Sequence, residues 1–320
     1  MKTLVMAPAL FLLSVVVSLA QSETAFNGYQ RLTNREIALT LSAPTGFAYR
    51  IQTSTNLSNW SALATLAATN FSLNHTDSAA PYLPQRFYRA EQLPAGVLTG
   101  DHFSTTNGEV VVHVRNHATF IMTWQGKTIY CDPVSGGGPY TALPKADLLL
   151  VTHSHSDHFS ASTLNSARAA NGIILAPLAV YNDGSMSALR SVTGILTNGM
   201  STNLLGLSVE AVPAYNGNHP KGSGNGYVVT LGGKRFYLSG DTGDVPEIRM
   251  LPNIEAAFVC MNVPYTMTVA DAAAAVRAFQ PRVVYPYHYR NSDQTFADLV
   301  DFKRRVGQDL GIEARLRKWY

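Results

Sequence analysis

The sequence has few of the residues that mark several common protein classes. Only 2 cysteines occur in 320 residues, Cys131 and Cys260, and they do not form a C-x-x-C pair. This excludes a framework of several disulfides and the paired-thiol motifs of zinc and redox centres. An even count permits one disulfide, but both cysteines lie in apolar, strand-like segments, so we expect two small buried side chains.

The sequence also has little excess charge of either sign and few long apolar segments. The formal net charge is only +3, and no block of lysine and arginine runs through the chain. A diffuse charge of this size gives no reason to expect nucleic acid as a partner. After residue 20 no stretch stays apolar for long enough to cross a bilayer, so we expect no membrane span in the mature protein.

The first 20 residues have the composition of an export signal. Lys2 supplies the positive start, residues 4–17 form a mostly apolar core, and Ser18 and Ala20 are small residues at the positions that a signal peptidase reads. We therefore predict a signal peptide over residues 1–20 and a secreted or periplasmic protein. An uncleaved anchor is the alternative, which the shortness of the apolar core disfavours.

Residues 22–95 differ from the rest of the chain. They are rich in Thr, Ser, Asn and Ala, with short alternating segments such as 48–53 that are separated by turn-forming clusters. This pattern predicts a small all-β sandwich module. Its only histidine, His75, is expected on a surface loop, and residues 96–101 are expected to form a linker.

Residues 102–320 alternate between strand-like and helix-like segments. The strands fall into two groups with helices later in each half, which predicts an α/β domain of two sheets covered by helices. Thr268 and Asp271 form a capping-box-like start for a helix that Pro281 ends. The apolar spacing over residues 294–310 predicts another helix.

The most informative stretch is the run from His153 to His158. Histidine is scarce, 9 in 320 residues, yet His153, His155 and His158 fall within six positions and Asp157 lies among them. The apolar strand-like segment 146–152 leads straight into the run, and ligand sites of α/β proteins lie at such strand ends. Imidazole and carboxylate suit zinc and similar metals, so we predict that His153 and His155 face one ion and Asp157 and His158 a second.

Other strand ends supply further candidate ligands. Asp241 follows the apolar strand 235–238 and is placed to bridge two cations, and His288 ends the strand-like segment 283–287. A polar loop after the segment 207–212 holds both Asn216 and His219. Asn216 follows the strand more closely, but His219 is the better ligand for zinc, so we favour His219 for the first ion.

These residues resemble those of the metallo-β-lactamase fold superfamily over about residues 108–290. The stretch Asn116-His117-Ala118-Thr119 followed by Asp132-Pro133 looks like the lactonase-like and phospholipase-D-like branch, although that branch usually has Gly where Asn116 stands. His117 is either a residue behind the ligands or a packed strand residue. The N-terminal module is similar to fibronectin type III domains, which implies either a passive spacer or a binder of carbohydrate or cell surface.

The resemblance implies a four-layer αββα sandwich over residues 102–320. It also implies two divalent metal ions, zinc or manganese, held by a shared set of ligands: His153, His155, Asp157, His158, His219, Asp241 and His288. A metal-bridging hydroxide oriented by Asp157 would then attack an ester, lactone or phosphodiester in a small-molecule or lipid-like substrate. The alternative is a metal-binding or surface-binding protein without catalysis.

Overall fold

The structure is a computed structural model that describes residues 3–7, 25–135 and 140–320. Most of the predicted signal peptide lies outside these ranges; its described part is the strand β1 (Thr3–Ala7). The chain divides into two compact units, Met1–Ser104 with Glu109–His113, and Thr105–Gly108 with Val114–Tyr320. Among the described residues no helix combines the length and the hydropathy needed to cross a membrane.

The first unit is built from two antiparallel sheets. Its strands are β1, β2 (Ala25–Arg31), β3 (Ile37–Ser42), β4 (Ala48–Ser54), β5 (Ser61–Ala67), β6 (Ser72–Asp77), β7 (Arg86–Leu93) and β8 (Gly100–Thr105). One sheet has the order β1-β7-β4-β5-β8 and the other β2-β3-β6. Alternate residues of β3, such as Leu39, are buried against Ile51 and Tyr88 of the larger sheet, which makes a two-sheet core.

The predicted surface position of His75 is wrong. His75 lies within β6, which pairs with β3 along its whole length, and its side chain is buried. The residues of β6 are mostly polar, so their composition does not reveal a half-buried strand.

The second unit contains two sheets that face each other. The chain passes from one unit to the other at β9 (Gly108–Asn116). The first sheet then runs in chain order through β10 (Thr119–Trp124), β11 (Lys127–Cys131), β12 (Ala146–Leu150), β13 (Arg168–Ala176) and β14 (Thr193–Ile195). The second sheet runs in chain order through β15 (Ser201–Leu204), β16 (Leu207–Ala214), β17 (Gly224–Leu231), β18 (Lys234–Leu238), β19 (Ile254–Cys260), β20 (Val283–Tyr287) and β21 (Glu313–Ala314). Phe120 of β10 stacks on Phe258 of β19 at 3.9 Å between ring centroids, so the inner faces meet in an aromatic core.

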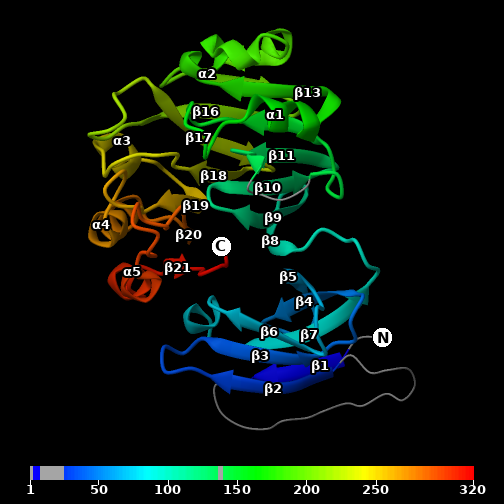
Figure 1. Cartoon of the computed structure of the whole chain (residues 1–320). Helices are drawn as coiled ribbons and strands as arrows, with labels where there is room; N and C mark the ends of the chain where they lie inside the picture. Colours follow the sequence, from blue (N-terminus) through cyan, green and yellow to red (C-terminus); the bar gives the residue numbers. More distant parts are fainter. Residues whose placement is uncertain (1–2, 8–24, 136–139) are drawn as a thin grey trace. The chain divides into compact units, whose positions relative to one another are not determined.

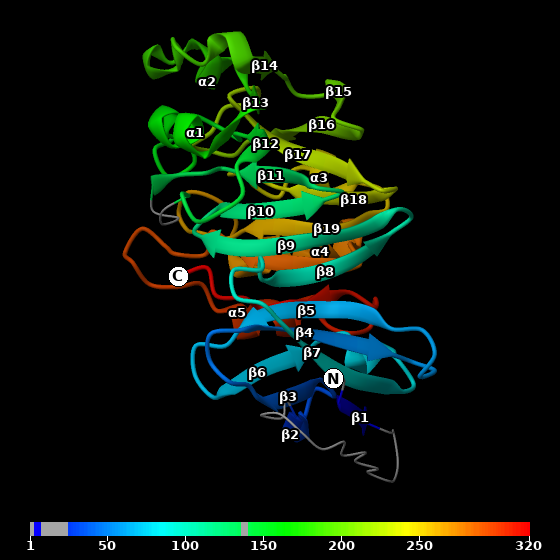
Figure 2. The ribbon, with the colours of Figure 1, turned by 90° about the vertical axis from the view of Figure 1, so that its right-hand side faces the viewer.

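Helices cover the outer faces of both sheets and complete four layers (Figure 1). They are α1 (Ala161–Ala167), α2 (Leu178–Asn182), α3 (Pro246–Arg249), α4 (Val269–Phe279) and α5 (Leu299–Val306). On one side Leu164 of α1 and Val180 of α2 pack against the first sheet. On the other side α4 lies behind β19 (Figure 2). The predicted αββα arrangement is therefore confirmed.

Two sequence expectations about local structure have different outcomes. The predicted cap of α4 is confirmed, because the Thr268 side chain accepts a hydrogen bond from the Asp271 amide. The predicted helix over 294–310 is too long. Asp298 caps α5, which ends before Gly307, and the preceding segment is held by local hydrogen bonds from Thr295 to Asp293.

The cysteines are small core residues, as expected. Cys131 ends β11 and Cys260 ends β19, both are buried, and neither forms a disulfide. Burial raises the pKa of the Cys260 thiol to about 11, which keeps it protonated and unreactive.

Candidate metal centre

Six strand ends of the second unit converge on one cluster of histidines and carboxylates. In parallel pairs such as β11–β12, β18–β19 and β19–β20 the carboxyl ends of the strands meet at one edge of a sheet. The residues at these ends are His117 after β9, Asp132 after β11, His153 to His158 after β12, His219 after β16, Asp241 after β18 and His288 after β20. The structure thus brings together all seven residues that the sequence proposed as ligands.

The first group is formed by His153, His155 and His219, whose ring nitrogens lie within 4.8 Å of one another. His219 Nε2 is 3.2 Å from His155 Nδ1. Asn216 lies behind His219: its Oδ1 accepts from the His219 amide and lies 3.0 Å from His219 Nδ1. Since the amide oxygen fixes a proton on Nδ1, the bare Nε2 of His219 faces the group.

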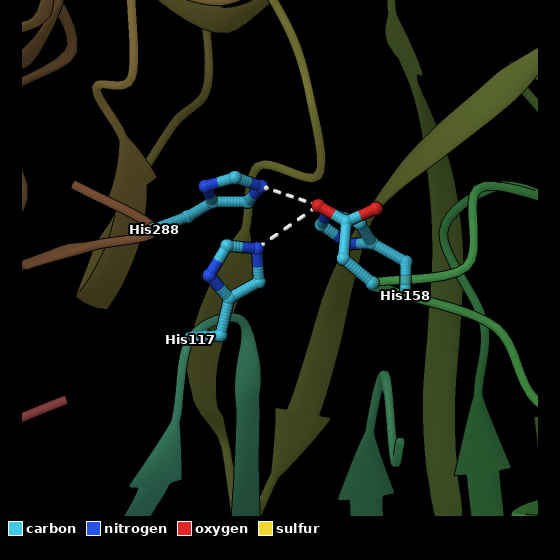
Figure 3. A group of neighbouring side chains, drawn as sticks. His117, His158 and His288 are labelled. Atoms are coloured by element: carbon cyan, nitrogen blue, oxygen red, sulfur yellow. Dashed lines mark hydrogen bonds and ion pairs between the residues drawn. The ribbon is translucent and has the colours of Figure 1, made fainter. Parts of the chain in front are cut away.

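The second group is formed by His117, Asp157, His158 and His288. Asp157 Oδ2 lies 2.9 Å from His117 Nε2, 3.4 Å from His288 Nε2 and 3.7 Å from His158 Nε2. Figure 3 shows the rings of His117 and His288 side by side, each with a nitrogen directed at this carboxylate oxygen. Ligand atoms that surround one tetrahedral zinc at its usual bond lengths are about 3.3 Å apart, so the separations of Asp157 from His288 and His158 fit an ion, whereas the shorter contact with His117 is a hydrogen bond.

Asp241 lies between the two groups. Its Oδ1 is 3.3 Å from His158 Nε2 and 3.4 Å from His288 Nε2, both in the second group. Its Oδ2 is 3.9 Å from His153 Nε2 and 3.9 Å from His219 Nε2, both in the first group. One oxygen of the carboxylate therefore faces each group.

Several polar atoms of the cluster are buried without a hydrogen-bond partner. They are His153 Nε2, His158 Nε2, both ring nitrogens of His288 and Asp241 Oδ1. A buried polar atom without a partner costs free energy, and several that point at one place indicate a ligand there. Imidazole nitrogens with carboxylate oxygens are a donor set for zinc and related ions, so the cluster is capable of binding metal.

Burial and charge shift the pKa values of the cluster in a consistent way. Burial disfavours the charged Asp157 carboxylate, but the hydrogen bond from His117 and the ion-pair contact with His288 outweigh it and lower its pKa. Burial likewise opposes the charge on Asp241, yet His288 and His158 lower its pKa. Burial lowers the pKa of His153, which favours the neutral ring that metals bind. Both carboxylates are thus ionised and His153 is neutral.

The charge of His158 follows the carboxylates around it. Burial favours its neutral form, but Asp241 and Asp132 outweigh burial and raise its pKa well above the usual value. The two carboxylates therefore stabilise a positive charge at His158. A bound cation would supply the same kind of charge.

Asp132 is a functional residue that the sequence pattern did not assign to the site. It is fully buried, and its Oδ2 lies 2.7 Å from His158 Nδ1 and accepts a hydrogen bond from the Thr152 hydroxyl. Its Oδ1 accepts from the Thr152 amide. A carboxylate behind an imidazole fixes the ring orientation and directs the other nitrogen into the site. The available signal was the Asp132-Pro133 turn directly after an apolar strand.

The backbone at three of these positions is left-handed. His117, Asp132 and His288 have φ values of 56°, 42° and 47°. Residues other than glycine adopt this region rarely, and Asp and His are among the types that tolerate it best. Each of the three residues turns the chain at a strand end so that its side chain reaches the cluster.

Comparison with known proteins agrees with this arrangement. A model of the beta-lactamase superfamily domain matches residues 112–288. A protein of Thermococcus kodakarensis named "UPF0173 metal-dependent hydrolase" is 34% identical over 215 residues, which cover 63% of this chain and 95% of the relative.

Solved structures give the same result. A Parabacteroides distasonis protein named as a metal-dependent hydrolase has 35% sequence identity and a TM-score of 0.62, covering 69% of this chain and 99% of its own. A metallo hydrolase of Ignicoccus hospitalis has 24% identity and a TM-score of 0.57, covering 65% of this chain and 95% of its own, which bears on the fold alone. The chain therefore belongs to the metallo-β-lactamase superfamily and to its metal-dependent hydrolases.

Proposed function

We propose that the second unit is a two-ion hydrolase that acts on an ester, a lactone or a phosphodiester. The observation that carries the proposal is the position of Asp241, which directs one oxygen toward each histidine group. A carboxylate so placed suits the bridging ligand of two ions a few ångströms apart.

Each ion would have its own set of protein ligands. His153, His155 and His219 would hold the first, and Asp157, His158 and His288 the second, with Asp241 shared. Because five of the seven donors are imidazoles, two are carboxylates and none is a thiolate, we propose zinc, with manganese as the alternative. Such ions supply a water nucleophile at neutral pH and a Lewis acid that polarises the substrate oxygen.

The protein's own groups orient the reaction. Asp157 is ionised and its Oδ2 is held by His117 and His288, so it is a fixed acceptor at the edge of the second group. We propose that Asp157 orients the attacking water. Asp132 and Asn216 keep His158 and His219 in the orientations that direct Nε2 into the site.

Metal analysis and activity together test this proposal. We expect about two ions per chain, and hydrolysis that is lost on chelation and returns with zinc or manganese. A panel of lactones, phosphodiesters and simple esters, including lipid-like ones, would then give the substrate class. Bound metal with no hydrolysis of any member would favour the alternative, a metal-binding protein without catalysis. Hydrolysis indifferent to chelator would contradict the proposal outright.

We also propose that the protein is exported and that its first unit serves outside the cell. The support is the composition of residues 1–20 and the fibronectin-type-III-like sequence pattern of the module, which suits a spacer or a binder of carbohydrate or cell surface. Removal of residues 1–20 would take β1 away and leave β7 as an edge strand, whose Arg86, Arg89 and Glu91 discourage pairing with other chains. The N-terminal sequence of the protein recovered from its natural host tests export; a chain that keeps Met1 and stays inside the cell would refute it.

A further inference from the structure

His117 and Tyr320 form a contact chain that ends at the metal centre. Tyr320 Oη lies 2.8 Å from His117 Nδ1, and His117 Nε2 lies 2.9 Å from Asp157 Oδ2. The two residues are far apart in sequence, and the His117 side chain is buried. Neither residue belongs to the ligand set that the sequence proposed.

The chemistry of the three groups fixes the direction of both hydrogen bonds. An ionised carboxylate can only accept, so the proton between His117 and Asp157 lies on His117 Nε2. A neutral imidazole has one N–H, which leaves Nδ1 as an acceptor. The Tyr320 hydroxyl must therefore donate to Nδ1, and His117 in turn donates to Asp157.

We propose that Tyr320 is a positioning residue, which acts through His117 to hold Asp157 in place for the second ion. This inference deepens the proposed function and rests on it for the role of Asp157. A residue behind a ligand orients it and raises its affinity for the ion, and Asp132 is placed to do this for His158 of the same group. Two ligands of the second ion would then be held from behind, and the first ion would not depend on Tyr320.

The surroundings of Tyr320 fit this role. Its ring packs against Tyr289 at 5.0 Å and Phe296 at 5.3 Å between centroids, and the Arg290 guanidinium lies 5.0 Å above it. These contacts restrict the ring so that its hydroxyl stays directed at His117. The His117 backbone is held as well, because its amide donates to Trp319 and its carbonyl accepts from His288.

A set of variants tests the proposal through the affinity of the second ion. Tyr320→Phe keeps the ring and removes only the hydroxyl, and we expect one of the two zinc affinities, that of the second ion, to fall about 10-fold, the lower end of such effects, while the other stays unchanged. The matched control is Tyr289→Phe, whose hydroxyl lies near backbone atoms of Trp319 and Arg317 and should leave both affinities unchanged. Titration calorimetry with zinc, with unfolding midpoints to verify folding, gives these values.

A double-mutant cycle separates positioning from a general loss of structure. If Tyr320 acts through His117, then Tyr320→Phe should cost nothing further in a His117→Ala background. Wild-type affinity in Tyr320→Phe, or losses that add in the double variant, would overturn the proposal.

Nitrogen NMR of the metal-free protein tests the contact without any ion. We expect His117 to carry its proton on Nε2, and its Nδ1 signal to move toward that of a free acceptor in Tyr320→Phe but not in Tyr289→Phe. An unchanged Nδ1 signal, or a proton on Nδ1, refutes the role of Tyr320. Absence of a second zinc in the wild type, by contrast, refutes the proposed function, so the two failures are distinguishable.

Discussion

Each unit of the molecule contains a deeply buried aspartate, and the two aspartates have different kinds of partner. In the first unit, the Asp77 side chain is fully buried, pairs with Arg86 at 2.5 Å and accepts a hydrogen bond from the Tyr88 hydroxyl. In the second unit, the Asp241 side chain is 5% exposed, and its ionic contacts within the described residues are with imidazoles. Asp77 has a permanent cation beside it, whereas Asp241 has only groups that can also bind a metal.

One pair of buried histidines, His102 and His158, shows the same contrast. His102 of the first unit has a partner for each nitrogen, Thr65 Oγ1 at 2.8 Å and Glu109 Oε2 at 3.1 Å. His158 of the second unit has Asp132 on Nδ1, while its Nε2 is buried without a hydrogen bond. A buried polar residue whose partners are complete stabilises a fold, and one with an atom left over indicates a site for a ligand.

The largest effect is expected at Asp241. Asp241→Asn removes the charge that faces both histidine groups, and we expect hydrolysis to fall more than about 100-fold, since even residues behind the ligands cost 10–100-fold. The measurement is kcat/KM together with metal content. Asp244→Asn is the control, because Asp244 lies in the same loop but pairs with Arg249. Activity of Asp241→Asn within a few-fold of the wild type would refute the proposed difference between Asp241 and Asp77.

The effect at Asp77 should fall on stability instead. Asp77→Asn leaves the Arg86 guanidinium without its buried counter-charge, and removal of one partner of such a pair costs about 3 kcal/mol. We expect a lower unfolding midpoint and unchanged kcat/KM. Glu91→Gln, which removes a pair with Arg50 that is about one third exposed, is the matched variant and should do much less. A loss of activity in folded Asp77→Asn would mean that the first unit takes part in catalysis.

The smallest effect is expected for a carboxylate in water. Asp309 is exposed and pairs with Arg277, whose hydrogen bonds lower its pKa from 3.8 to about 2. A lowered pKa in the folded state means that the pair stabilises the protein above about pH 4 and that this contribution disappears as the pH falls toward about 2. Unfolding midpoints of the wild type and Asp309→Asn should therefore differ slightly at pH 7 and converge in acid. A difference that persists at pH 2 would contradict the assignment.

The ligand positions could be predicted because their signals are local. Short apolar segments predicted β12, β18 and β20, and a polar residue at the end of a buried strand is informative by itself. The residues behind the ligands were harder to assign. Asp132 and Tyr320 act across the fold, on side chains that the sequence does not place beside them.

The incorrect expectations have physical causes as well. The apolar spacing of residues 294–310 favours a helix, but Asp293 and Asp298 form side-chain hydrogen bonds to the backbone that delay its start to Leu299. The preference for His219 over Asn216 was not among these, because it rested on ligand chemistry rather than on spacing: His219 faces the cluster and Asn216 lies behind it.

The left-handed backbone at His117, Asp132 and His288 places side chains in the metal centre but lowers the stability of the folded protein. Each such residue costs on the order of 1 kcal/mol relative to a glycine there. Glycine would relieve this strain, but at Asp132 it would also leave the buried Thr152 amide without its acceptor, so the strain is tolerated for the sake of the side chains that build the centre. Heat-resistant variants of this enzyme should gain their stability elsewhere, in the cores and turns.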